Sequence, residues 1–410
     1  MKKVAIIGHG VVGSGVCEVL LKKKDELYRK TGEEIEVKYI LDLRDFPDSS
    51  VTVIHDFDII EKDEEINIVV ETMGGVNPAY EYTKRLLLSG KDVVTSNKEL
   101  VAQKGAELIK IAKENNRNYM FEASVGGGIP IIRPLLQCLE ANDFNEISGI
   151  LNGTTNFILT KMINEGFSFE DALSMAQELG YAEKNPSADI DGFDTSRKIC
   201  ILASLVYGVH IYPDEVHTEG IRDVSLIDVQ YAASWNERVI KLIGKAKKDE
   251  SGKLYMIVCP VILRDENLLT GIEDVYNGIL AKGDLVGDVI FYGKGAGKLP
   301  TASAVVADVM DCAKHFNNRK PIFWEDSKGG AVSDYLDAPT LMYFRISIEN
   351  KEDIDRIREE FGDIRVLSRK NAQWSEFAFV TKEELPEREI LRKIGNCNVK
   401  VDAMIRVESD

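Results

Sequence analysis

Apolar positions follow two alternating spacings over the first 130 residues of the chain. Compact aliphatic runs predict strands at 4–7, 35–41, 66–72, 92–96 and 118–125. Apolar residues three and four positions apart predict helices at 16–28, 78–89 and 98–114. Strands that alternate with helices are typical of a parallel sheet covered on both faces. We therefore predict a doubly wound α/β domain over residues 1–130.

This alternation ends beyond residue 140. The pattern there predicts strands at 144–151, 241–248, 254–263 and 288–292, and helices at 154–165, 168–179, 191–207 and 301–315. Pro300 stands where it can begin the last helix, because a first-turn residue needs no hydrogen-bonded N–H. The mixed order predicts a second, α+β domain over residues 131–320.

The last seventy residues show a regular order of predicted strands and helices. The pattern predicts a strand, a helix, two strands, a helix and a strand at 341–349, 352–361, 364–369, 374–382, 387–394 and 399–407. This is the βαββαβ order of ferredoxin-like domains. We assign residues 338–410 to such a domain.

The composition suits a multidomain globular protein and excludes two classes of partner. A chain of 410 residues with 44% hydrophobic residues can build two or three cores. A net charge of −17 argues against nucleic-acid binding, which depends on clustered Lys and Arg. The apolar start at 4–7 is too short for a signal peptide or a membrane span. We expect a cytoplasmic protein whose partners are small polar molecules, with no membrane contact.

Cysteine and histidine give no sign of a metal centre. The six cysteines are scattered without a C-x-x-C pair, and most lie in apolar runs. The five histidines lack the spacing of metal ligands. We expect reduced cysteines and no zinc site.

A G-x-G-x-x-G motif joins the first predicted strand to the first helix. Its residues are Gly8, His9, Gly10, Val11, Val12 and Gly13. Glycines there let the backbone approach a pyrophosphate, and the helix N-terminus supplies free N–H groups and a positive dipole. The motif therefore predicts a dinucleotide site. A second glycine-rich segment, 293–301 with Gly295, also enters a helix, and we expect 293–316 to return toward the cofactor.

The residue that ends the second strand selects the dinucleotide. Asp42 can accept hydrogen bonds from the ribose diol of NAD, and its charge repels the 2′-phosphate of NADP. Arg44 lies two positions on and can instead reach that phosphate. The sequence favours NAD and leaves NADP open.

Two other strand ends carry polar or glycine residues where doubly wound sheets bind ligands. The turn after Glu71 contains Met73 and Gly74 and can pass under a nicotinamide ribose. At the next end Asn97 resembles a helix N-cap, which places Lys98 in the first helical turn. A cation there opposes the helix dipole, so its presence indicates a function.

A glycine triplet, 126–128, follows the last strand of the first domain. Its carbonyls, together with Glu122, can supply oxygen ligands to a hard cation. It can equally be a hinge that leaves the nucleotide domain. Residue types alone favour the hinge.

An acidic stripe precedes an apolar helix. Asp191, Asp194 and Lys198 fall on the helical face that also carries Ile201, Leu202 and Leu205. Charges on a face that packs into the core cost several kcal/mol unless they are paired or line a polar cavity. The stripe is either a site or an ordinary i,i+4 surface pair.

These motifs together resemble homoserine dehydrogenase. The segments that carry the resemblance are Gly8–Gly13, Glu71–Gly75, Ser96–Lys98, Glu122–Pro130, Leu151–Asn156, Leu179–Asp189, Asp194, Lys198, Glu219–Ile221 and Gly293–Ala304. They span residues 3–316 in the family's order. The resemblance implies NAD(P)-dependent interconversion of aspartate 4-semialdehyde and homoserine, on the route to threonine, methionine and isoleucine. It also implies that the domain at 131–320 binds substrate and forms a homodimer or homotetramer.

The resemblance implies roles for individual residues. Lys98 and Lys198 act at the reacting carbonyl, and Glu183, Asp194 and the Gly180 turn hold the substrate's amino group. The resemblance further implies that the segment with the glycine triplet binds a Na⁺ or K⁺ ion and is not simply a hinge. The residues that would coordinate this ion are Glu122, Val125, Gly127 and Ile129. Reduction of an aldehyde moves hydride to carbon and a proton to oxygen, and a positioned ammonium can polarise the carbonyl and donate that proton. We expect Lys198 to be the donor and Lys98 to orient the carbonyl, with Asp189 and Asp191 in support.

The tail resembles the ACT-type regulatory domain that many bacterial homoserine dehydrogenases carry, often linked to feedback by threonine. That family usually has a Pro-Gly turn after its first strand, whereas this chain has Asn350, Lys351 and Glu352. Without the glycine the backbone is less able to approach an amino acid. Threonine binding and a purely assembling role both stay open.

Two other functions remain to be weighed. Another NAD(P)-dependent dehydrogenase of a small amino or hydroxy acid would share the glycine turn but would not need Glu183, Asp194 and Lys198. A nucleotide-sensing regulator would not need two lysines at a reacting centre.

Overall fold

The computed structural model describes residues 1–249, 252–316, 318 and 320–409. The chain forms two compact units that are discontinuous in sequence. The first comprises 1–144, 197–215 and 282–331, and the second comprises 145–196, 216–281 and 332–410. The limits 1–130, 131–320 and 338–410 therefore stay predictions, and residue 410 lies outside the described part.

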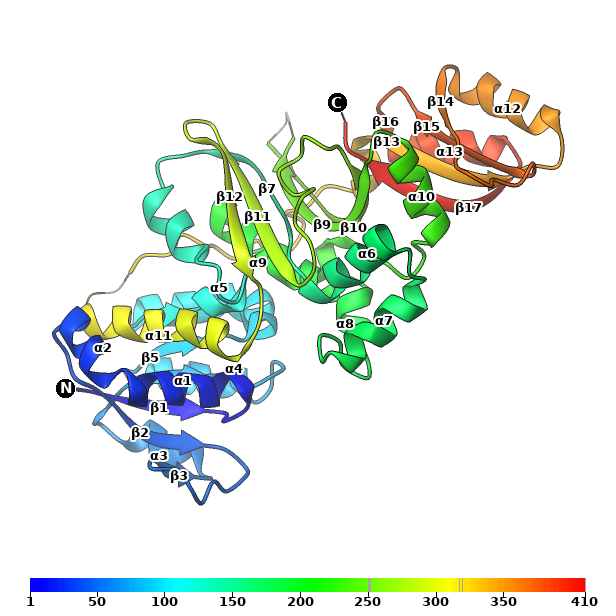
Figure 1. Cartoon of the computed structure of the whole chain (residues 1–410). Coiled ribbons are helices and arrows are strands. Elements are labelled where there is room, and N and C mark those ends of the chain that lie inside the picture. Colours follow the sequence, from blue (N-terminus) through cyan, green and yellow to red (C-terminus); the bar gives the residue numbers. More distant parts are fainter. Residues whose placement is uncertain (250–251, 317, 319, 410) are drawn as a thin grey trace. The chain divides into compact units, whose positions relative to one another are not determined.

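A parallel sheet organises the first unit (Figure 1). Its strand order is β3-β2-β1-β4-β5-β6, which is the order of a doubly wound dinucleotide-binding sheet and confirms the predicted fold. The strands are β1 (Lys2–Ile7), β2 (Ile35–Leu41), β3 (Thr52–Ile54), β4 (Ile66–Glu71), β5 (Asp92–Thr95) and β6 (Tyr119–Met120).

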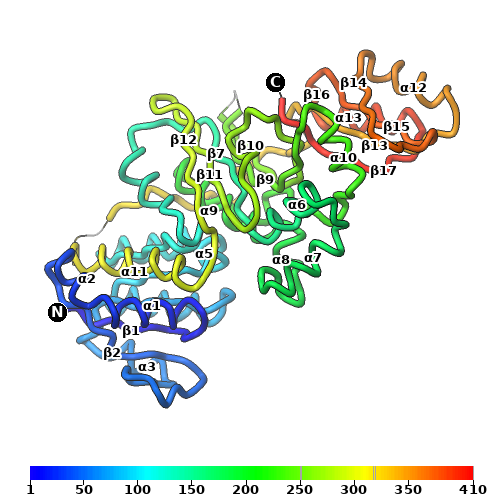
Figure 2. The backbone as a smooth tube through the Cα atoms, viewed as in Figure 1, coloured from blue at the N-terminus to red at the C-terminus, as the bar shows by residue number. Residues whose placement is uncertain are grey.

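Helices cover this sheet. They are α1 (Val11–Lys22), α2 (Lys24–Thr31), α3 (Phe57–Lys62), α4 (Ala79–Leu88), α5 (Lys98–Glu114) and α11 (Lys298–Lys314). In Figure 2, α11 lies beside α1, although nearly three hundred residues separate them in sequence. Both helices bury their apolar faces on β1, β2 and β4, in one core that includes Val16 and Val305. A Cβ on Gly15 of α1 would lie 3.2 Å from the Ala302 Cβ of α11, so small residues permit this close packing.

Three predicted elements of this unit differ in extent. The helix predicted at 16–28 is two helices, which meet at Lys23. The strand predicted at 118–125 ends at Met120, and a 3₁₀ turn, Glu122–Ser124, replaces its second half. The helix α11 begins at Lys298 rather than at 301. Pro300 is tolerated there because the first-turn N–H groups have no partner within the helix.

The second unit places helices over a mixed sheet. Its elements before the tail are β7 (Phe144–Ile150, which begins at the edge of the first unit), α6 (Gly153–Glu165), α7 (Phe169–Glu178), α8 (Ser187–Ile190), β8 (His217–Thr218), α10 (Leu226–Ser234), β9 (Val239–Lys248), β10 (Leu254–Leu263) and β11 (Tyr276–Gly283). The helix α9 (Phe193–Tyr207) begins in this unit and continues in the first, which also contains β12 (Gly287–Lys294).

The tail has the predicted ferredoxin-like order. Its elements are β13 (Pro339–Ser347), α12 (Lys351–Phe361), β14 (Ile364–Leu367), β15 (Glu376–Thr381), β16 (Leu385–Pro386), α13 (Glu387–Asn396) and β17 (Lys400–Val407). The strands run β17-β13-β15-β14 with antiparallel neighbours. Ile357 of α12 and Ile390 of α13 pack into one core with Phe344 and Phe379 of the sheet.

The tail's sheet is continuous with the central sheet. β17 pairs in parallel with β10, where Val261 lies opposite Arg406. The strands of the second unit thus follow the order β11-β7-β9-β10-β17-β13-β15-β14. The tail is therefore built into the unit that contains the predicted substrate residues.

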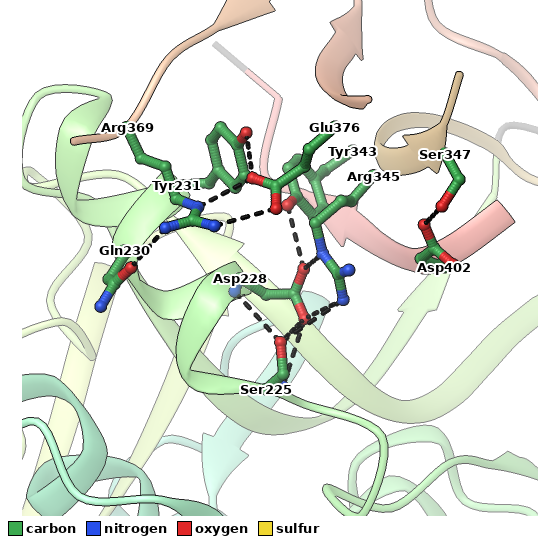
Figure 3. A network of polar contacts seen from close by, with 10 residues as sticks. All are labelled: Ser225, Asp228, Gln230, Tyr231, Tyr343, Arg345, Ser347, Arg369, Glu376 and Asp402. Carbon is green, nitrogen blue, oxygen red and sulfur yellow. Dashed lines mark hydrogen bonds and ion pairs between the residues drawn. The ribbon is translucent and has the colours of Figure 1, made fainter. Parts of the chain in front are cut away.

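A network of polar side chains reinforces this connection (Figure 3). The buried carboxylate of Asp228 on α10 accepts hydrogen bonds from Tyr343 Oη at 3.0 Å and Arg345 Nε at 2.8 Å on β13. The hydroxyl of Tyr231 donates to Glu376 Oε1 at 2.6 Å, and Arg369 also donates to the same carboxylate.

Among the described helices, none is long and apolar enough to cross a membrane.

Candidate active site

The glycine turn between β1 and α1 has the geometry of a phosphate-binding loop. Gly8 has φ +88°, a region that side-chain-bearing residues rarely adopt. A Cβ on Gly13 would lie 1.9 Å from the Gly8 carbonyl oxygen, so the helix can begin this close to the strand only with glycine. Around Gly10, the N-cap of α1, a Cβ would meet open space. These residues fit a dinucleotide whose phosphates approach the N-terminus of α1.

Asp42 and Arg44 lie beside this turn. Asp42 Oδ2 accepts the His9 N–H at 2.7 Å, and Asp42 Oδ1 accepts the Arg44 Nε–H at 3.0 Å. The hydrogen bonds from Arg44 hold the pKa of the Asp42 carboxyl well below its usual range, against the effect of burial. The Arg44 side chain is largely exposed. Both residues predicted to select the dinucleotide thus lie beside the glycine turn, where the Arg44 guanidinium is bound to the Asp42 carboxylate.

One cavity brings the predicted cofactor and catalytic residues of the first unit together. Its volume is about 350 Å³. It is lined by Val11, Val12, Met73, Gly74, Gly75, Ser96, Asn97, Lys98, Glu99, Ala123, Ser124, Gly127, Lys198, Gly295, Ala296, Gly297 and Thr301. The two lysines therefore border the same space as the glycine turn and the 293–301 loop.

Local structure explains how each lysine reaches this space. Asn97 caps α5, since its Oδ1 accepts the Leu100 N–H at 3.1 Å, and Lys98 is the first residue of that helix, as predicted. Lys198 lies on α9 and is only 8% exposed. The apolar face that the sequence assigned to this helix is buried, including Ile201 and Leu202. Asp194 and Lys198 thus lie on a core-facing stripe, and Lys198 borders the cavity. Asp191, which the sequence placed on the same stripe, is instead the C-cap of α8, because α9 begins only at Phe193.

In the second unit an asparagine holds two of the acids. Asn152 caps α6, and its Nδ2 donates to Asp189 Oδ1 at 2.7 Å and to Asp194 Oδ2 at 2.9 Å. Asp194 is 3% exposed. Nothing in the sequence indicates this bridge, because the acids lie 37 and 42 residues away from Asn152. Asp189 therefore supports Asp194 through a shared amide.

The turn before α8 is more exposed to solvent than Asp194. Gly180 has φ +74°, and Glu183 is exposed. Thr154 Oγ1 donates to the Tyr181 carbonyl at 2.6 Å, which attaches this turn to the start of α6. Asp191 makes an ion pair with Arg222 and with it fastens α8 to the segment after β8.

The glycine triplet is a close crossing point as well as a candidate ligand loop. A Cβ on Gly127 would lie 2.3 Å from the Gly295 carbonyl oxygen. The Glu122 carboxylate accepts the N–H groups of Ile131, Ile132 and Arg133 at 2.6, 2.9 and 2.7 Å. Its side-chain oxygens are thus already engaged. Within the described residues, no three His, Cys, Asp or Glu side chains gather as a metal site, so a cation here would depend on main-chain carbonyls.

Sequence models of known families match most of the chain. The homoserine dehydrogenase family matches residues 130–310, and the homoserine dehydrogenase NAD-binding domain matches residues 8–122. The homoserine dehydrogenase of Synechocystis sp. is 42% identical over 318 residues, which cover 75% of this chain and 72% of that protein. The Bacillus subtilis enzyme is 39% identical over 320 residues, with 76% and 73% covered.

Solved structures of homoserine dehydrogenases also match this chain. A homoserine dehydrogenase from Thiobacillus denitrificans has a TM-score of 0.90 and 32% identity over 100% of this chain and 98% of that one. A hyperthermophilic archaeal homoserine dehydrogenase in complex with NADPH has a TM-score of 0.66 and 32% identity, and covers 79% of this chain and 100% of that one.

These matches extend over both units and include the glycine turn, both lysines and the acids of α8 and α9. They confirm the resemblance drawn from the motifs, and the chain belongs to the homoserine dehydrogenase family of NAD(P)-dependent oxidoreductases.

Proposed function

We propose that this enzyme interconverts L-aspartate 4-semialdehyde and L-homoserine, with Lys198 as the proton donor and acceptor. The observation that carries the proposal is the shared cavity: Lys98 and Lys198 border the same space as the glycine turn at Val11 and Val12. In that role the enzyme serves the aspartate-derived route to threonine, methionine and isoleucine.

The chain's own residues handle the proton. A nicotinamide dinucleotide, when bound, supplies hydride to the aldehyde carbon or takes it from the alcohol. In the reducing direction Lys198 donates a proton to the carbonyl oxygen as the C–H bond forms, and in the oxidising direction its amine accepts the hydroxyl proton. Lys98 at the start of α5 orients the same oxygen and stabilises its developing negative charge.

Carboxylates hold the other end of the substrate. We assign the substrate's ammonium group to Glu183 and Asp194, with the Gly180 turn beside them. Asn152 supports this role, because its Nδ2 restrains Asp194 Oδ2 at 2.9 Å. A cation in place of water beside a buried acid offsets the cost of burying that charge.

For the cofactor we propose NAD in preference to NADP. The Asp42 carboxylate is fixed at the glycine turn by the His9 N–H, where it can meet a ribose diol. Arg44 is the residue that would accommodate NADP. Gly8, Gly10, Gly13, Met73, Gly74 and Gly295 complete the proposed cofactor site.

A monovalent cation, Na⁺ or K⁺, is proposed for the loop at 122–129. Val125, Gly127 and Ile129 lie in a buried segment, and carbonyl oxygens suit a hard cation. Glu122 would contribute its main-chain oxygen, since its carboxylate caps the following helical turn.

We propose that the enzyme acts in the cytoplasm as a homodimer or homotetramer. In this assembly the tail serves for the association of subunits. Asn350, at the position of the usual Pro-Gly turn, caps α12 reciprocally with Asp353. This capping box occupies the backbone N–H groups that an amino-acid ligand would approach.

The function is tested by the absorbance at 340 nm while the purified enzyme oxidises homoserine with NAD and then with NADP. We expect reduction of both, with the larger kcat/KM for NAD. No homoserine-dependent signal with either would contradict the function and favour a nucleotide sensor. A larger signal with another small hydroxy or amino acid would favour a different dehydrogenase.

A further inference from the structure

A buried carboxylate lies behind the cavity, outside the residues assigned so far. Glu71 is the last residue of β4 and is 0% exposed. Its Oε1 accepts the Met73 N–H at 2.7 Å, and its Oε2 accepts the Thr95 hydroxyl at 2.6 Å. The two bonds lead to different strand ends, since Met73 follows β4 and Thr95 ends β5.

The second bond continues toward Lys98. Thr95 Oγ1 accepts the Asn97 N–H at 2.9 Å, and the Asn97 side chain caps α5. Asn97 Nδ2 then donates to the Gly75 carbonyl at 2.7 Å. The bonds thus form a closed circuit that starts at Glu71, runs through Thr95 and Asn97, and returns to the turn that Glu71 holds.

The circuit joins two sides of the cavity. Met73, Gly74 and Gly75 line one side, and Ser96, Asn97 and Lys98 line another. We propose that Glu71 is a positioning residue of the dehydrogenase reaction, whose ionised carboxylate holds the 73–75 turn and the first turn of α5 in register. The proposal rests on the proposed role of Lys98 and on dinucleotide binding beside Met73. A misplacement of the acting groups by about 1 Å can cost on the order of 10²-fold in rate.

Protonation would disturb the circuit. Burial raises the pKa of Glu71 to about 7, although the Thr95 hydroxyl, the Met73 N–H and Asn97 all favour its ionised form. Tyr119 of β6 interacts electrostatically with Glu71, and burial raises the pKa of Tyr119 as well. The ionised carboxylate accepts from both donors, whereas the neutral acid carries a proton on one oxygen and must reverse or break one bond. We therefore expect positioning to weaken as the pH falls through 7.

Glu71→Gln mimics the neutral acid, because an amide accepts at one atom and donates at the other. Asp92→Asn is the matched control. Asp92 is buried at the start of β5, accepts from Asn118 and has a pKa raised by burial, but it lies at the opposite ends of the parallel strands.

The experiment measures kcat/KM for homoserine oxidation from pH 5.5 to 9, NAD(P)H binding by fluorescence, and the thermal midpoint. For Glu71→Gln we expect kcat/KM to fall about tenfold at pH 8, weaker NAD(P)H binding, and no acid limb near pH 7. Its thermal midpoint at pH 8 should equal or exceed that of the wild type, because the variant buries no charge. Asp92→Asn should keep the wild-type pH profile and binding.

A wild-type pH profile and wild-type NAD(P)H affinity in Glu71→Gln would overturn the proposal. An equal loss in Asp92→Asn would also overturn it, since the effect would then follow any buried acid of the sheet. If the wild type did not oxidise homoserine, the function would fail, and the comparison of NAD(P)H affinities would still decide the role of Glu71.

Discussion

At the scale of single residues, the site depends on polar groups that break the apolar pattern and on partners that hold them. Lys98 opposes a helix dipole, and Asp194 and Lys198 interrupt a core-facing stripe, so the sequence alone marks all three. Asn152 and Glu71 lie in segments that carry the family resemblance, but no pattern assigns either of them a role. An asparagine at a helix start and an acid at a strand end are ordinary, and their partners are distant in sequence. Only the folded chain shows what they hold.

Asn152 offers a first prediction. Asn152→Ala removes the amide that bridges Asp189 and Asp194, so the two carboxylates lose their shared donor and Asp194 Oδ2 loses its 2.9 Å hydrogen bond. We expect KM for homoserine to rise about tenfold or more, while KM for the dinucleotide changes less than about twofold. Steady-state kinetics checks this. Asn164→Ala is the control, because Asn164 lies on the same helix and its Nδ2 donates to Glu273 Oε1 at 3.1 Å at an exposed position. Parallel increases in both KM values would contradict the clamp.

Asp42 and Arg44 offer a second prediction. Asp42→Ala removes the charge that repels a 2′-phosphate and releases the Arg44 guanidinium. The ratio of kcat/KM with NADP to that with NAD should rise at least about tenfold. Arg44→Ala should lower the same ratio. An unchanged ratio in both variants would mean that another residue selects the cofactor.

At the scale of elements, regular periodicity made most helices and strands predictable. The helix α5 and the strand β10 coincide with their predicted limits. The pattern missed several elements that are short or lack alternation, which are β3, α3, α8, β8, α10, β11 and β16. It also extended a strand through Glu122. There the buried carboxylate turns the chain by capping residues 131–133, a contact that periodicity does not encode.

The strand β17 carries Arg406, a buried arginine at the centre of an ion triad that the sequence did not reveal. Arg406 is 5% exposed and pairs with Glu219 at 2.7 Å and with Glu387 at 2.7 Å. Burial raises the pKa of Glu219, but hydrogen bonds from His217 and Arg406 outweigh it and lower the value to about 2. The stability that this carboxylate contributes is therefore complete above pH 4.5 and is lost as the pH falls toward 2.

A third prediction follows for this triad. Arg406→Met leaves the buried carboxylate of Glu387 without its cation and removes one partner of the part-buried Glu219, so we expect the free energy of unfolding to fall by about 3–5 kcal/mol. Chemical denaturation followed by circular dichroism measures this. Lys400→Ala, an exposed position on the same strand, should change stability by less than about 0.5 kcal/mol. Equal stability of Arg406→Met and the wild type would show that the triad contributes nothing.

At the scale of the whole molecule, the order of most helices and strands could be predicted, because each part of the chain has its own periodicity. The pairing of β17 with β10 could not, because strand pairing between distant segments leaves no local pattern. This pairing and the contacts of Asp228 make the tail part of the unit that contains Asp189 and Asp194. Truncation of the tail would therefore expose a central strand, so its role is better tested in the full chain.

The fourth prediction concerns threonine. With a capping box in place of the usual glycine turn, the tail should not bind it, and millimolar threonine should leave homoserine oxidation unchanged. Isothermal calorimetry on the full chain measures threonine binding directly and so tests the prediction independently of activity. Micromolar binding, or inhibition in that range, would contradict the assembly-only role.

The central claim is that Lys198 moves the proton while other residues hold the dinucleotide. The most direct test measures turnover and NAD(P)H affinity in the same preparation of Lys198→Ala. We predict that turnover falls by about 10²–10⁴-fold and that NAD(P)H affinity stays within about twofold of the wild type. Retained turnover, or an equal loss of turnover and binding, would contradict the account.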